Sequence, residues 1–97
     1  MSDGVRIILP GVLRELAGGL GELVVPVVDG TTSLRTVLDT AVATRPRLDA
    51  RIRDETGALR RHVNVFVDGQ DVRRAGGLDA PVGSGAVIHI LPSIAGG

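Results

Sequence analysis

Apolar residues near the start of the chain form a short run and then repeat at helical spacing. Residues 5–9 are mostly apolar and stop at Pro10-Gly11, a turn signal, so they predict a first strand. Residues 11–17 predict a short helix that ends at Gly18-Gly19, because glycine suits the left-handed conformation found at helix C-termini. The chain therefore begins with a strand followed by a short helix.

A second strand and the clearest helix follow. Residues 23–28 predict the strand, in which Pro26 belongs on a sheet edge because it has no N–H to donate. Next comes a helix that has Thr32 or Ser33 as its N-cap and ends before Pro46. Its buried stripe has the spacing i, i+3, i+4, i+7 and i+8 and consists of Leu34, Val37, Leu38, Ala41 and Val42.

The middle of the chain is polar and rich in arginine. Leu48 and Ile52 predict only one irregular helical turn in a surface connection, and residues 53–60 predict a loop. Residues 62–68 then alternate strictly between valine and other residues, as in a strand with one buried face. The expected core face consists of Val63, Val65 and Val67.

The last third of the chain contains turns and one long apolar strand. Asp68-Gly69 predicts a hairpin turn, and residues 70–73 predict a short returning strand. Residues 76–85 are rich in glycine and predict an irregular crossing. Residues 86–91 form the final strand, which Pro92 is expected to end.

This order of elements predicts one α+β domain over residues 1–92. We expect a mixed sheet of about four to five strands with one main helix packed on one face. The first and last strands are nearly continuous apolar segments, so they belong in the centre of the sheet. Residues 93–97 are expected to leave the domain as a flexible, exposed tail about 16 Å long.

The tail ends in two glycines, Gly96 and Gly97. Without Cβ atoms, they can pass through a narrow channel and present a carboxylate inside a foreign active site. That carboxylate, with a reference pKa of about 3.5, is ionised at neutral pH and is a poor acyl donor. Adenylation followed by sulfur attack would convert it to a thiocarboxylate. The alternative is that the pair is an accident of a chain with 14 glycines.

Composition excludes several classes of function. The 11 basic and 11 acidic residues balance, and Phe66 is the only aromatic residue, so no nucleic-acid partner is expected. The absence of cysteine excludes disulfides and thiolate metal sites. The absence of lysine excludes copies linked through side chains. With neither signal-peptide features nor an apolar run of about 20 residues, we expect a cytoplasmic protein without membrane contact.

The second half of the chain carries a set of motifs typical of one family. They are His62-Val63-Asn64-Val65-Phe66-Val67-Asp68, Asp71-Val72-Arg73, Gly76-Gly77-Leu78 and Ile90-Leu91-Pro92-Ser93-Ile94-Ala95-Gly96-Gly97. With them the whole chain resembles the MoaD/ThiS family of ubiquitin-like sulfur carriers, and especially its CysO branch. The resemblance implies a β-grasp fold. It also implies a thiocarboxylate on Gly97, made by a MoeB/MoeZ-type activating enzyme that consumes ATP, while the carrier itself binds no cofactor.

For the CysO branch, the resemblance also implies a pathway to cysteine. The thiocarboxylate would attack an aminoacrylate held on a pyridoxal-phosphate cysteine synthase, and a zinc metalloprotease would then release the amino acid. Sulfur donation to molybdopterin or to a sulfur-containing natural product stays open. The long loop at residues 45–61 makes a thiamine role less favoured. The carrier would be a protein cosubstrate and not an enzyme, and a passive ubiquitin-like interaction module is the remaining alternative.

A docking patch is expected on the strand face opposite the valines. Phe66 lies on this face, and the alternation of the last strand places His89 and Leu91 there too. The alternative is that loops or the turn at residues 48–52 cover it. His62 and His89 fall short of a metal site. The partner-binding residues are expected to continue into the tail: Phe66, His89, Leu91, Pro92, Ser93, Ile94 and Ala95.

Overall fold

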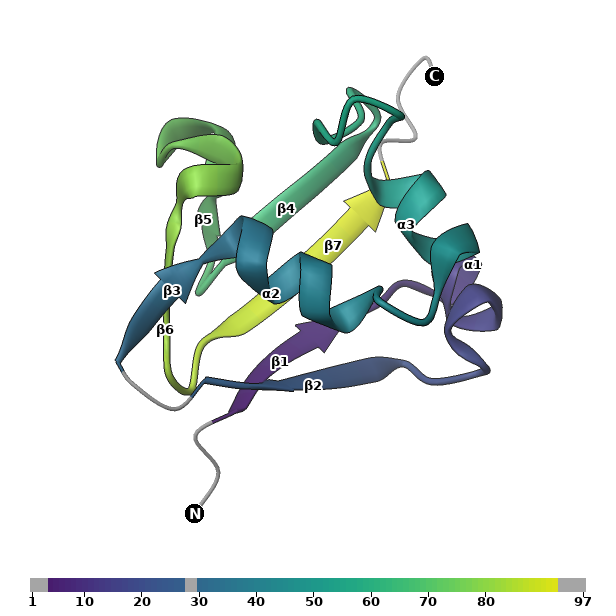
Figure 1. Ribbon diagram of the computed structural model, residues 1–97, viewed down its shortest axis with the longest axis horizontal. Helices are drawn as coiled ribbons and strands as arrows, with labels where there is room; N and C mark the ends of the chain where they lie inside the picture. The colour runs from purple at the N-terminus through teal and green to yellow at the C-terminus, as the bar shows by residue number, and fades with distance from the viewer. Residues whose placement is uncertain (1–3, 28–29, 93–97) are drawn as a thin grey trace.

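A mixed sheet runs through the part of the chain that the computed structural model describes, residues 4–27 and 30–92. Its five strands lie in the order β2-β1-β7-β4-β5 (Figure 1). Strand β1 (Gly4–Ile8) pairs antiparallel with β2 (Glu22–Pro26) and parallel with β7 (Val87–Pro92). Strand β4 (Val63–Val67) pairs antiparallel with β7 and with β5 (Gln70–Asp71). The predicted central position of the first and last strands is therefore confirmed, as is the edge position of Pro26.

Side-chain alternation fixes which face of the sheet is buried. On β7, Ile88 and Ile90 are fully buried while His89 and Leu91 are exposed. The same period of two holds on the other strands, because successive side chains of a strand point to opposite faces. Val67 also packs against the core, as predicted for this face of β4, but it is only partly buried, because the strand ends there in the Asp68-Gly69 hairpin turn.

Helix α2 (Leu34–Ala41) covers the buried face and supplies the stripe that its spacing predicts. Ser33 is its N-cap, and the Ser33 Oγ accepts a hydrogen bond of 3.2 Å from the Thr36 N–H. This bond satisfies one of the N–H groups that the first turn of a helix leaves without a partner. The predicted cap is thereby resolved to Ser33.

Replacing Ser33 with alanine is expected to lower the free energy of unfolding by about 1 kcal/mol, because the N-cap acceptor is lost. Urea denaturation measures the change. Ser33→Asp is the matched control, since aspartate also caps helices and should stay within a few tenths of a kcal/mol of the parent chain. Equal losses in both variants would contradict this role.

The prediction of one irregular turn at residues 48–52 is wrong. Helix α3 (Pro46–Ile52) is regular, and both Leu48 and Ile52 belong to the core. Pro46 opens this helix instead of breaking the chain, because a proline in the first turn has no N–H that needs an acceptor. Arg53 closes the helix by binding the carboxylates of Asp49 and Asp39, each at 2.7 Å.

The remaining segments connect the sheet strands. The predicted short helix is present as α1 (Gly11–Arg14) and the 3-10 turn η1 (Glu15–Ala17), and it ends at Gly18 with a left-handed φ of 71°. The crossing at residues 72–83 contains two further 3-10 turns, η2 (Val72–Arg74) and η3 (Gly77–Asp79), and a short strand β6 (Pro81–Gly83). Strand β6 pairs with β3 (Thr31–Ser33) in a two-stranded ribbon that the sequence pattern does not predict.

Candidate functional site

The candidate site begins where the central strand β7 ends. Pro92 is the last residue of β7, so the strand includes the proline instead of stopping before it. It lies opposite Val63 on β4, and this is the final pair between the two strands. The predicted tail residues Ser93, Ile94, Ala95, Gly96 and Gly97 lie outside the described residues. The structure therefore defines the root of the tail, where Pro92 pairs with β4, while the pairing of β7 with β1 ends earlier, at His89.

Arg73 forms hydrogen bonds to the start of β4 and the turn before it, beside this root. Its Nη2 donates hydrogen bonds to the carbonyl oxygens of Val63 (2.8 Å) and Arg60 (3.0 Å), and its Nη1 donates to Asn64 Oδ1 (3.1 Å). The guanidinium thus joins the turn before β4 to the first residues of that strand. In the sequence Arg73 belongs to the Asp71-Val72-Arg73 motif, but the pattern does not predict these hydrogen bonds, because the acceptors are mainly backbone oxygens.

The face of the sheet opposite α2 carries the predicted docking residues. Phe66 lies directly opposite His89, which in turn lies opposite Ile8, so the three form one row across β4, β7 and β1. Leu91 lies two residues further along β7 and is 44% exposed, and Val24 on β2 is 55% exposed. We call these five residues the open face.

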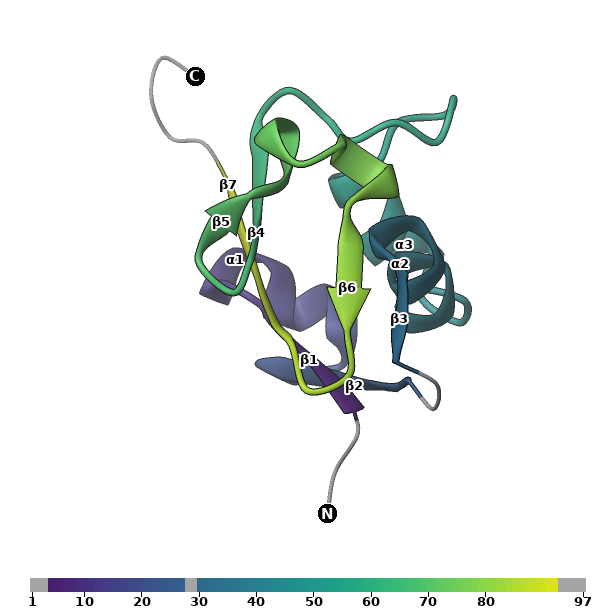
Figure 2. The ribbon, with the colours of Figure 1, turned by 90° about the vertical axis from the view of Figure 1, so that its left-hand side faces the viewer.

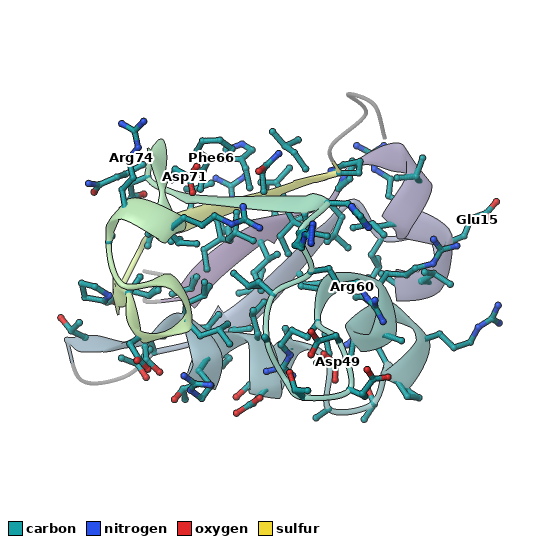
Figure 3. The ribbon with its side chains drawn as sticks, turned by 90° about the horizontal axis from the view of Figure 1, so that it is seen from above. Glu15, Asp49, Arg60, Phe66, Asp71 and Arg74 are labelled. Atoms are coloured by element: carbon teal, nitrogen blue, oxygen red, sulfur yellow. The ribbon has the colours of Figure 1, made fainter. Side chains whose placement is uncertain are left out.

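No described element covers the open face. Helices α2 and α3 lie together with β3 and β6 on one side of the sheet (Figure 2), and Phe66 points to the other side (Figure 3). The alternative that residues 48–52 cover this patch is therefore excluded, because α3 packs on the buried face. The structure brings Phe66, His89 and Leu91 onto one surface, as the alternation predicts. Their role in docking stays a prediction.

Charged groups border the open face at both ends of its central row. Arg6 and Glu22 form an ion pair of 2.7 Å at the β1–β2 end. The hydrogen bond that Arg6 donates holds the pKa of the Glu22 carboxyl below its usual value. Asp71 on β5 lies opposite Phe66 at the other end. An apolar centre with a polar rim is the usual composition of a protein-binding surface.

The described residues show no catalytic constellation of their own. In residues 4–27 and 30–92, no group of three metal-binding side chains is close enough to hold an ion. Within the same ranges no polar or charged residue is buried, and His62 and His89 are both exposed. No helix in the described part of the chain is long and apolar enough to cross a membrane.

Comparisons with known proteins agree with this arrangement. The model of the ThiS family matches residues 7–97. The sulfur carrier protein CysO of Mycobacterium tuberculosis is 34% identical over 95 residues, which cover 96% of this chain and 98% of that protein. CysO in the crystal structure of the BexX/CysO complex from Amycolatopsis orientalis is 33% identical, with a TM-score of 0.80 over 96% of this chain and 99% of that one.

A further structural relative is SAMP1 from Haloferax volcanii, which is 28% identical with a TM-score of 0.78 over 97% of this chain and 99% of that chain. The shared architecture confirms the predicted ubiquitin-like β-grasp fold. It also supports the carrier role at the level of the family, in which the protein is acted on and does not act as the catalyst. The chain therefore belongs to the ThiS family of ubiquitin-like sulfur carrier proteins and, within it, resembles the CysO proteins.

Proposed function

We propose that this carrier transports sulfur as a thiocarboxylate on Gly97, most directly for the synthesis of cysteine. One observation carries the proposal: the family match extends to Gly97 itself, and the chain spans 98% of the length of CysO from M. tuberculosis. The Gly96-Gly97 pair of this chain thus falls inside the region that matches the family. The tail follows the end of β7, a central strand of the sheet.

The proposed reaction has two steps, both performed on a partner enzyme. The Gly97 carboxylate attacks the α-phosphorus of ATP, which releases pyrophosphate and leaves an acyl adenylate. A sulfide nucleophile then attacks the carbonyl carbon, AMP departs, and the C–S bond replaces the C–O bond to the nucleotide. The first step is needed because a carboxylate ionised at neutral pH resists nucleophilic attack. The carrier contributes its C-terminal carboxylate and a surface to which the enzyme binds.

The activating enzyme is proposed to be of the MoeB/MoeZ type. CysO of A. orientalis crystallises in a complex with BexX, and this supports a carrier that works by forming complexes. The proposed acceptor is an aminoacrylate on a pyridoxal-phosphate cysteine synthase, with a zinc metalloprotease to release the product. Molybdopterin or another sulfur-containing product as the acceptor is the alternative, and the fate of the loaded carrier distinguishes it from cysteine.

Intact mass spectrometry tests the proposal. The chain is incubated with the activating enzyme, ATP and a sulfide source, and we expect a gain equal to the replacement of one oxygen atom by sulfur. Addition of the synthase with its aminoacrylate should then yield a carrier with one cysteine joined to Gly97. No gain in the first step would leave only a passive interaction module. Gain without the cysteine adduct would retain the carrier and reject cysteine as the product.

The open face provides a second test, because we expect it to bind the activating enzyme. Phe66→Asp should raise the KM for the carrier about tenfold or more, since a charge replaces an apolar contact at the interface. The melting temperature should change little, because Phe66 is only half-buried and is not part of the core. Steady-state loading kinetics measure the first effect and thermal denaturation the second.

Thr44→Asp is the matched control for this variant. Thr44 is exposed just after α2, on the other side of the sheet, and the same charge there should leave the KM within about twofold of the parent value. A collapse of the melting temperature in Phe66→Asp would instead assign Phe66 to the core. Unchanged KM with intact folding would remove the open face from the interface.

A further inference from the structure

A cleft of about 560 Å³ opens beside the root of the tail. Its walls come from α1, the end of α3, the start of β4 and the end of β7, and Pro92 is one of its lining residues. Helix α3 packs against η1, the 3-10 turn that continues α1, at this end of the molecule (Figure 1). We call this cavity the root cleft. It is separate from the open face, since none of the five residues of the open face lines it.

The root cleft is lined by apolar residues and has a basic rim. Val12 is the most exposed large apolar residue of the described part of the chain, at 69%, and it lines the cleft together with Pro92. The rim carries Arg51, Arg60 and His62, and no residue that lines the cleft carries a carboxylate. Such a surface complements a ligand that offers both carboxylates and aliphatic groups.

The two arginines of the rim form no ion pair among the described residues. The Arg60 Nε is oriented by a 2.6 Å hydrogen bond that it donates to the carbonyl oxygen of Ala50. Arg60 also borders a neighbouring hollow that contains Asp54. Hydrogen bonds from Thr56 hold the pKa of the Asp54 carboxyl low, and the charge of Arg60 adds to this effect. Arg51 is exposed at the last turn of α3 and is therefore the side chain most available to a partner.

The position of the cleft points to its occupant. An enzyme that takes a five-residue tail, about 16 Å long when extended, must bring the mouth of its channel close to the residue where the tail begins. That residue is Pro92, which lines the root cleft. Whatever surrounds the channel mouth then lies against Val12 and the basic rim. This step rests on the proposed function.

We infer that the root cleft binds an acidic segment with aliphatic residues at the mouth of the activating enzyme's channel. The carboxylates of that segment pair with Arg51 and Arg60, and its aliphatic side chains pack on Val12 and Pro92. This contact fixes the orientation of the carrier at the mouth of the channel, while the open face supplies a second, separate contact area. Charge pairs at such a rim act mainly on the rate of association and on its dependence on salt.

The experiment compares Arg51→Glu with Arg74→Glu in binding and in loading. Arg74 is the matched control, because it is also an exposed arginine and does not line the root cleft. Binding to the activating enzyme is measured by calorimetry without ATP, and loading is measured by intact mass with ATP. Arg51→Glu should raise both Kd and KM about tenfold with unchanged kcat, and Arg51→Gln should have a smaller effect. Arg74→Glu should stay within about twofold.

Salt dependence and folding complete the test. Added salt should weaken binding of the parent chain more than binding of Arg51→Glu, because the charge pair is screened. Thermal denaturation confirms that each variant is folded.

Parent-like Kd and salt dependence in Arg51→Glu would overturn the inference, as would an equal loss in Arg74→Glu or a parent chain that does not bind the enzyme at all. A parent chain that binds but is never loaded would refute the proposed function alone, and the effect of Arg51→Glu on Kd would then still support the cleft.

Discussion

Removal of Gly97 is expected to abolish ATP-dependent sulfur loading while the domain stays folded. The deletion withdraws the carboxylate by about 3.3 Å along an extended tail. Displacements of about 1 Å from a productive geometry already cost on the order of a hundredfold in rate, so the loss should exceed that. The core consists of residues between 5 and 90, so the deletion removes no core residue and the melting temperature should not change. Intact mass spectrometry of the loading reaction and thermal denaturation check the two halves of this result.

Gly97→Ala separates the length of the tail from its width. The carboxylate stays at its original distance, but the added Cβ needs room in the channel. We expect a lower kcat with a KM close to that of the parent chain, because the docking surfaces are unchanged. A folded deletion variant that still accepts sulfur at the parent rate would refute the assignment of Gly97 as the loaded residue.

Truncation of two neighbouring side chains of β7 to alanine should have different effects: one should lower stability, and the other should weaken loading. Ile90→Ala is expected to lower the free energy of unfolding by about 3 kcal/mol, within the usual range of 2–5 kcal/mol for a buried aliphatic residue. Ile90 is fully buried and lies opposite Val65, which is also fully buried, so the cavity cannot fill from solvent. This loss is a large part of the stability of a small domain. Urea denaturation measures it directly.

Leu91→Ala is the control for Ile90→Ala, since it removes a side chain of the same size from the next residue. Leu91 is 44% exposed, and its truncation should change the free energy of unfolding by only about 0.5 kcal/mol. It should instead raise the KM for loading, because Leu91 belongs to the open face. Similar destabilisation by both variants would contradict the assignment of the two faces.

The strands and the main helix could be predicted because their patterns are local. The alternation of residues 62–68 fixes the two faces of β4, and the spacing from Leu34 to Val42 fixes the buried stripe of α2. The relation between Phe66, His89 and Leu91 follows from the same period of two. These three residues could therefore be placed on one face without coordinates.

The missed elements depend on contacts between distant segments. Helix α3 offers only Leu48 and Ile52 as apolar signals among polar residues, and it is stable because both side chains reach the core. Strands β3 and β6 contain three residues each, too few for a periodic pattern, and each forms because the other lies beside it. Tertiary packing therefore determines whether α3, β3 and β6 form.

The candidate site likewise has one part that is visible in the sequence and another that only the fold brings together. The terminal diglycine is visible in the sequence itself, and the fold adds that the tail starts from a central strand. The root cleft could not be found in advance, because Val12, Arg51, Arg60 and Pro92 are brought together from distant parts of the chain. The role of Arg73 was hidden for the same reason, since its hydrogen-bond partners lie nine to thirteen residues away.

The parallel pairing of β1 with β7 also has a kinetic consequence. Arg6 lies opposite Val87, so the two central strands come from opposite ends of the polypeptide. Nearly the whole chain must close as one loop before this pair can form. The conformational entropy of that loop is therefore lost before the contact contributes any favourable free energy. We therefore expect the rate-limiting step of folding to be the late insertion of β7 between β1 and β4. Until that insertion, intermediates would expose the bare edges of both strands to other chains.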